Sequence, residues 1–121
     1  MKEEKIDSNE SSIDFIKDNI RDAQILKISF LFENYEKKIV IDLVQIGGQS
    51  NKIRLEFEEV QFISFYDDEG CIVEHYVEYF KLFKNGDSYY FSIDPYDEEE
   101  KVNSDDNCVI VAKKIKGYVI E

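Results

Sequence analysis

The sequence predicts a β-rich α+β domain in which one short N-terminal helix precedes seven or eight mostly antiparallel strands. Apolar and polar residues alternate with a period of two over much of the chain after residue 25, a pattern typical of half-buried strands. Nine Phe and eight Tyr supply side chains that suit a pleated surface, and only one Pro and five Gly interrupt it. A curved sheet, a sandwich and a partly open barrel all fit this pattern.

A chain of 121 residues has the length of one domain. Residues 1–10 are charged and polar, so we expect a flexible tail with nothing to bury. The single β-rich domain then spans residues 11–121 and opens with a helix over residues 12–19, capped by Ser11 or Ser12. The apolar residues of this helix recur at helical spacing, so that one face can lie across the sheet: Ile13, Ile16 and Ile20.

A β-hairpin is predicted after the helix. Residues 26–32 and 39–44 alternate between apolar and polar, and residues 34–37 turn the chain between them. The second of these strands is apolar on both faces. It should therefore be internal in the sheet or covered by the helix.

The middle of the chain is less regular. Gly47-Gly48 begins a loop, and residues 53–57 then form the most regular half-exposed strand. Residues 60–66 form either another strand or the continuation of the same strand through a bend. Residues 71–83 are rich in aromatic and β-branched side chains, which favours a long strand, with a helix as the alternative.

The last third of the chain contains a second hairpin and an acidic connection. Asn85-Gly86 is a strong signal for a tight turn whose two central residues have positive φ, and residues 89–93 form the strand after it. Residues 94–107 form a long acidic connection that holds the single proline. The chain ends in strands at 108–116 and 117–120, bent at Gly117.

The charge of the chain limits its partners. It carries 27 acidic and 15 basic residues, a net charge of −12. Binding to nucleic acid phosphates requires clustered Lys and Arg, so neither nucleic acid nor an anionic membrane surface is an expected partner. A basic protein would be attracted. The alternative is that the acidity serves solubility alone.

We expect a cytoplasmic protein that needs no cofactor or metal and is not an enzyme. The N-terminus lacks an apolar signal core, and no apolar run approaches the roughly 20 residues that span a bilayer. The two cysteines should then be reduced. The single histidine, His75, follows Cys71 by four residues, which is roughly 13 Å along a strand and too far for a catalytic pair. The acidic connection could supply oxygen ligands for Ca²⁺, but it lacks the spacing of an EF-hand loop.

Two acidic clusters, each beside a tyrosine, form the predicted partner-binding surface. Such a surface focuses negative potential and raises the association rate with a basic partner, while tyrosine is enriched at interface hot spots. A solvated loop with no role, beside two ordinary tyrosines, is the alternative. The candidate residues are Tyr66, Asp67, Asp68, Glu69, Tyr96, Asp97, Glu98, Glu99, Glu100, Asp105 and Asp106.

One family resemblance bears on the partner. The run 22–30, beginning Asp22-Ala23-Gln24-Ile25, opens a hairpin after a short helix, and Ile39-Val40-Ile41-Asp42-Leu43 and the run 53–60 follow as strands. Over residues 13–66 this order resembles the small acidic bacterial immunity-type proteins that are encoded beside polymorphic toxins. The resemblance implies a protein that neutralises a toxin domain. Many such toxins are nucleases with basic clefts, which an acidic domain can occupy in place of phosphates.

The alternative function is a non-catalytic binding or adaptor module that joins a protein assembly by strand pairing at a sheet edge. The two functions differ in their salt dependence. Binding to a basic toxin domain should weaken as the salt concentration rises, whereas strand pairing should respond little.

Overall fold

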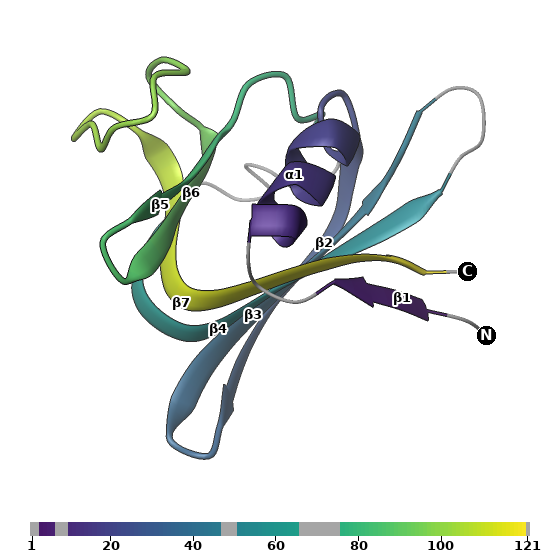
Figure 1. The fold of residues 1–121 in the computed structure, drawn as a ribbon, viewed down its shortest axis with the longest axis horizontal. Coiled ribbons are helices and arrows are strands. Elements are labelled where there is room, and N and C mark those ends of the chain that lie inside the picture. The colour runs from purple at the N-terminus through teal and green to yellow at the C-terminus, as the bar shows by residue number, and fades with distance from the viewer. Residues whose placement is uncertain (1–2, 7–9, 47–50, 66–75, 121) are drawn as a thin grey trace.

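The structure, a computed structural model, describes residues 3–6, 10–46, 51–65 and 76–120. The β-rich prediction is confirmed, because these residues form one helix and a single open sheet of antiparallel strands (Figure 1). Cys71 and His75 lie outside the described residues. In chain order the elements are β1 (Glu3–Ile6), α1 (Glu10–Asn19), β2 (Gln24–Glu33), β3 (Glu36–Val44), β4 (Lys52–Ser64), β5 (Lys81–Asn85), β6 (Ser88–Asp94) and β7 (Asn107–Ile120).

The predicted number of strands is too high for the described part of the chain. Six strands follow the helix, not seven or eight. β4 continues through the bend near residue 60, so the segments 53–57 and 60–66 belong to one long strand. β7 likewise passes Gly117 without a break and joins the segments 108–116 and 117–120. A seventh strand, β1, lies before the helix and pairs with the end of β7, within the segment predicted to be a tail.

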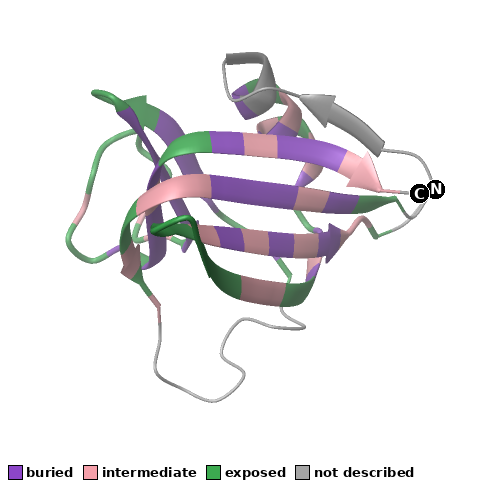
Figure 2. Cartoon of the chain, turned by 90° about the horizontal axis from the view of Figure 1, so that it is seen from below, coloured by how far each residue is buried: buried purple, intermediate pink, exposed green. Residues whose placement is uncertain are grey.

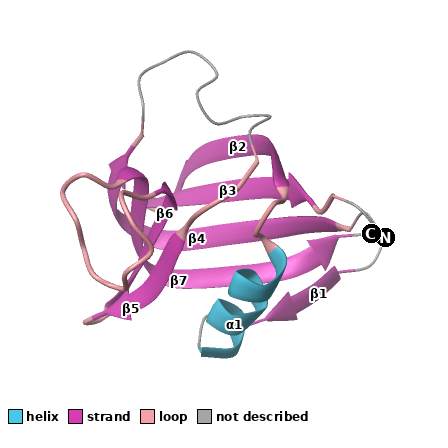
Figure 3. Cartoon of the chain, turned by 90° about the horizontal axis from the view of Figure 1, so that it is seen from above, coloured by secondary structure: helices cyan, strands magenta, loops and turns pink. Residues whose placement is uncertain are grey.

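The strand order across the sheet is β2-β3-β4-β7-β6-β5. β3 is internal, as its two apolar faces predict. β4 and β7 pair along most of their length and form the centre of the sheet. One edge of β7 pairs with β6 over its first half and with β1 over its last residues. The sheet curves around α1, with β5 and β6 at one end (Figures 1 and 3).

The bend in β4 explains this curvature. Glu59 has a φ of 54°, and the register with β7 shifts between Val60 and Phe62. A bulge of this kind adds a residue to one strand and increases its local twist. The second half of β4 and the first half of β7, which pair with each other, therefore turn toward the helix and carry β5 and β6 with them.

The main hydrophobic core lies between α1 and the concave face of the sheet. Ile16 of the helix and Ile20, which directly follows it, are fully buried against residues such as Ile41, Leu55 and Phe57. Figure 2 shows buried and less buried positions alternating along the strands, which is the predicted period of two. The helix begins at Glu10, so the serines expected at its N-cap lie inside its first turn.

Both predicted hairpins form. Asn34 and Tyr35, which join β2 to β3, have φ values of 52° and 65°, the pattern of a type I′ turn. The turn between β5 and β6 is displaced by one residue from its predicted place. Its central residues are Gly86 and Asp87, and only Gly86 has positive φ, at 67°, which is the pattern of a type II′ turn.

Candidate functional site

The acidic loop, residues 95–106, joins β6 to β7 at the end of the sheet where β5 and β6 lie (Figure 1). Together with the flanking Asp94 and Asn107 it contains seven acidic residues and one lysine. It therefore carries half of the net charge of −12. No segment of similar length in the described part of the chain concentrates as much negative charge.

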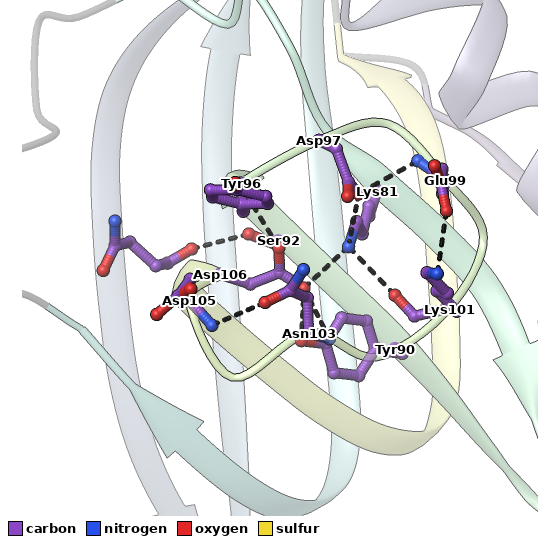
Figure 4. A network of polar contacts seen from close by, with 11 residues as sticks. Lys81, Tyr90, Ser92, Tyr96, Asp97, Glu99, Lys101, Asn103, Asp105 and Asp106 are labelled. Carbon is purple, nitrogen blue, oxygen red and sulfur yellow. Dashed lines mark hydrogen bonds and ion pairs between the residues drawn. The ribbon is translucent and has the colours of Figure 1, made fainter.

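A buried lysine of β5 lies beneath this loop. The side chain of Lys81 is fully buried, and its Nζ lies 2.9 Å from Asp106 Oδ2 and 3.0 Å from Asp97 Oδ1. Nζ also donates a hydrogen bond of 2.9 Å to the carbonyl oxygen of Lys101 (Figure 4). An ammonium group has three donors, and here each has an acceptor, which is the condition under which a buried charge is tolerated.

Asp106 connects the loop to the sheet. Its Oδ2 accepts a hydrogen bond of 2.7 Å from the Tyr90 hydroxyl of β6 and one of 3.2 Å from the amide of Asn103. Its Oδ1 accepts one of 2.8 Å from the amide of Tyr96. One buried carboxylate thus holds both ends of the loop against two strands. Such a fully satisfied network makes the loop rigid before any partner arrives.

Interactions within this network keep Asp106 and Lys81 charged although both side chains are buried. Burial alone would raise the pKa of Asp106, but hydrogen bonds from Lys81, the Tyr96 amide and Tyr90 outweigh it and hold that pKa below its usual range. Burial likewise opposes the charge of Lys81, yet Asp106 and Asp97 raise its pKa. Burial and the nearby Asp106 carboxylate raise the pKa of Tyr90 to about 12. At neutral pH the network therefore consists of a carboxylate, an ammonium and a neutral phenol.

This assignment predicts a loss of stability in acid. A carboxylate whose pKa is depressed in the folded state stabilises the fold fully above its unfolded pKa, about 3.9, and loses that contribution as the pH falls through the folded value. We expect the urea midpoint to fall steeply below pH 4. The Asp106→Asn variant should start from a lower midpoint at pH 7 and lose less on acidification. Equal acid sensitivity in both proteins would contradict the assignment.

Two ion pairs join the loop to the last turn of the helix and to the residues that directly follow it. Glu98 pairs with Arg21 at 2.8 Å, and Glu100 pairs with Lys17 at 2.6 Å. A cavity of about 290 Å³ lies between these pairs, next to the ring of Phe80. Because the pairs are exposed, each contributes at most about 1 kcal/mol. Such pairs can exchange for basic groups of a partner at little cost.

The predicted site residues fall into three groups. Tyr96, Glu98, Glu99, Glu100 and Asp105 are exposed on the loop, where a partner can reach them. Asp97 is partly buried over Lys81. Asp106 is buried, so the prediction that it belongs to the exposed acidic surface is wrong. It binds the loop from inside because a lysine lies beneath it. The third group lies outside the described residues: Tyr66, Asp67, Asp68 and Glu69.

Sequence reasoning missed the basic and phenolic members of the site. Lys81 stands between Phe80 and Leu82 in an apolar run, which is the one sequence feature that marks it as a buried cation. Nothing in the sequence distinguishes Tyr90 from Tyr89, because the two tyrosines are adjacent in the same aromatic strand. Their roles depend on the acidic loop folding back over β5 and β6.

The face of the sheet opposite the helix has a different electrostatic character. Arg54 contacts both carboxylate oxygens of Asp42, at 2.7 and 3.2 Å. Lys116 lies 3.5 Å from Glu58, and the Tyr118 hydroxyl donates a hydrogen bond to Glu56. Acidic and basic groups alternate here in neighbouring strands. On β3, β4 and the second half of β7, the acidic side chains of this face are therefore partnered by basic or phenolic groups.

No protein-family model, curated protein or solved structure matches the chain. Within residues 3–6, 10–46, 51–65 and 76–120, no three His, Cys, Asp or Glu side chains are grouped so as to hold a metal ion. The helix in this part of the chain is too short and too polar to cross a membrane.

Proposed function

We propose that this protein is an immunity-type inhibitor that binds a basic toxin domain, such as a nuclease domain, through its acidic loop and prevents the toxin from reaching its substrate. The observation that carries the proposal is the buried pair of Lys81 and Asp106, which holds the acidic loop in one conformation. Together with Asp94, this loop carries half of the net negative charge. The resemblance of residues 13–66 to immunity-type proteins supports the same function.

Two physical effects favour such a loop as a binding surface. A loop that is rigid before binding loses little conformational entropy when a partner docks, so more of the contact energy appears as affinity. Its negative charge raises the rate of encounter with a basic surface. Against a nuclease, exposed carboxylates such as Glu99 and Asp105 would occupy the places of substrate phosphates.

Growth rescue tests the proposal directly. The C-terminal domain of the large open reading frame beside this gene is expressed in bacteria, with and without this protein. We expect the domain to stop growth alone and growth to return when both are made. If the neighbouring domain is harmless, or if growth stays arrested although both proteins are soluble, the immunity function is rejected.

The charge of the loop gives a quantitative prediction. In the triple variant Glu98→Gln, Glu99→Gln and Glu100→Gln, we expect the association rate with the toxin domain to fall by about tenfold or more, because long-range attraction drives the encounter. Stopped-flow association at several salt concentrations measures the effect. The variant should also show a weaker salt dependence than the natural protein.

A matched control separates the loop from net charge alone. The exposed acids of the two hairpin turns, replaced as Glu33→Gln, Glu36→Gln and Asp87→Asn, remove the same charge elsewhere. We expect this control variant to associate with the toxin domain at a rate close to that of the natural protein. If both triple variants slow association equally, the loop is not the binding surface.

A second function, an adaptor module, is favoured by the hairpin of β2 and β3. Its end exposes several large apolar side chains, of which Phe32 is 68% and Tyr35 93% exposed. Exposed apolar clusters of this kind commonly mark protein–protein contacts. A partner held by this hairpin would bind with little salt dependence and would be lost in a Phe32→Ser variant, whereas the loop variant would still bind it.

A further inference from the structure

The sheet carries a second, smaller apolar cluster on the face opposite the main core. Phe83, Tyr90 and Val109 are buried there, and Val111 packs against them. The rings of Phe83 and Tyr90 lie 5.2 Å apart. Because side chains alternate along a strand, this cluster lies on the far side of β5, β6 and β7 from the helix. The acidic loop reaches this side as well.

A cavity of about 310 Å³ lies between this cluster and the second half of the loop. Tyr90, Val109 and Val111 form its floor, and Phe62 of β4 and Val102 of the loop flank it. Phe62 is 53% and Val102 54% exposed, so apolar surface reaches the solvent at the cavity. A dry cavity of about 150 Å³ holds a benzene ring. The cavity therefore has room for a whole aromatic side chain.

The loop gives this apolar cavity a charged wall. Asn103, Ser104 and Asp106 line it on the loop side, and the exposed Asp105 lies between the last two in sequence. The hydrogen bond from Tyr90 to Asp106 joins this wall to the floor, so cavity and loop form one rigid unit. Lys81 balances the charge of Asp106, so the negative charge near the cavity comes from the exposed acids of the loop around it, such as Asp105. An apolar floor within an acidic surround is complementary to an apolar side chain flanked by cations.

We propose that this cavity receives a large apolar side chain, most suitably an aromatic one, from a basic segment of the partner protein. The inference rests on the proposed function, because it takes the partner to be a basic protein that meets the acidic loop. It adds the chemistry of the partner segment: one aromatic residue with lysine or arginine on both sides. The aromatic residue would slow dissociation, while the charges would speed association.

Short peptides test the cavity without any toxin. The probes are acetylated, amidated pentapeptides: Lys-Arg-Trp-Arg-Lys, the same peptide with Ala in place of Trp, and Glu-Glu-Trp-Glu-Glu. Methyl resonances of Val102, Val109 and Val111 report binding by nuclear magnetic resonance. We expect the basic Trp peptide to shift these methyls, and the Ala and acidic peptides to bind at least tenfold more weakly.

Substitutions in the protein locate the effect. Ser64 is an exposed residue that lines the cavity, so Ser64→Phe should fill the space without disturbing the core. We expect this variant to bind the basic Trp peptide at least fivefold more weakly. Phe62→Ala, which removes a flanking side chain, provides a second test. Lys37→Phe adds the same aromatic side chain at an exposed site on β3 and should leave binding unchanged.

The outcomes are separable from those of the growth rescue. Equal binding of the Trp and Ala peptides, absence of methyl shifts with any peptide, or full binding by the Ser64→Phe variant overturns the cavity assignment, even if rescue succeeds. Equal binding of the acidic Trp peptide overturns the choice of a basic segment. If rescue fails but the basic Trp peptide binds as expected, the cavity inference stands and the immunity function alone is rejected.

Discussion

The Lys81→Met variant is expected to lose about 3–5 kcal/mol of unfolding free energy, the range found when one partner of a buried ion pair is removed. Methionine keeps the apolar stem of lysine, so packing around β5 changes little. The charge of Asp106 is then left without its cation in a buried site. Urea unfolding at pH 7, followed by far-ultraviolet circular dichroism, measures the loss.

Two further variants show whether the unpaired charge causes this loss. Adding Asp106→Asn to Lys81→Met removes the charge but keeps one acceptor oxygen, which can still serve Tyr90 and the Asn103 amide. We expect this double variant to be more stable than Lys81→Met by at least about 1 kcal/mol. Lys101→Met removes an exposed lysine that pairs with Glu99 at 3.0 Å, and it should change stability by no more than about 0.5 kcal/mol. If Lys101→Met cost as much as Lys81→Met, burial of the pair would not be the cause.

The Gly117→Ala variant is expected to lose about 1–3 kcal/mol because α1 packs directly on β7 at this position. A Cβ at Gly117 would stand 2.7 Å from Ile16 Cγ1 and 3.1 Å from Phe15 Cδ2. Cγ1 of isoleucine is close to the backbone, so the helix itself must move to relieve the clash. The φ of Gly117 is not in the left-handed region, so the expected loss comes from contact and not from backbone strain.

A double-mutant cycle with Ile16→Ala tests this contact. Ile16→Ala alone should cost about 2–5 kcal/mol, since Ile16 is fully buried in the core. The double variant removes both Ile16 contacts of the alanine at 117 and leaves only the longer one to Phe15, so the total loss should fall short of the sum by at least about 0.5 kcal/mol. Simple additivity would place the cost of Gly117→Ala elsewhere, for example in the strand itself.

Local features of the fold could be predicted because they depend on neighbouring residues. The period-two alternation of residues 53–57 and the helical spacing of Ile13, Ile16 and Ile20 each identified an element. Asn85-Gly86 identified a hairpin, although the turn lies one residue later. The strand count was wrong because a bulge such as that at Glu59 interrupts the alternation without ending the strand.

The role of β1 could not be predicted from its own residues. Glu3–Ile6 has too little apolar surface to indicate a strand, and it pairs because the second half of β7 leaves an edge unoccupied by β6. The role of Gly117 could not be predicted from the sequence either. The sequence predicts a bend in the strand at Gly117, whereas the structure shows that the helix packs closely on the sheet there. Both depend on where distant elements pack.

The sequence by itself determined the β-rich class, the single helix, the two hairpins and the net charge of −12, with its concentration between residues 94 and 107. Only the tertiary structure decided what each acidic group does. Asp106 became a buried anchor, while Glu99 and Asp105 stayed exposed, although all three belong to one acidic run. The physical reason is that burial and ion pairing depend on Lys81, which lies 25 residues before Asp106 and meets it only when the loop folds over β5 and β6.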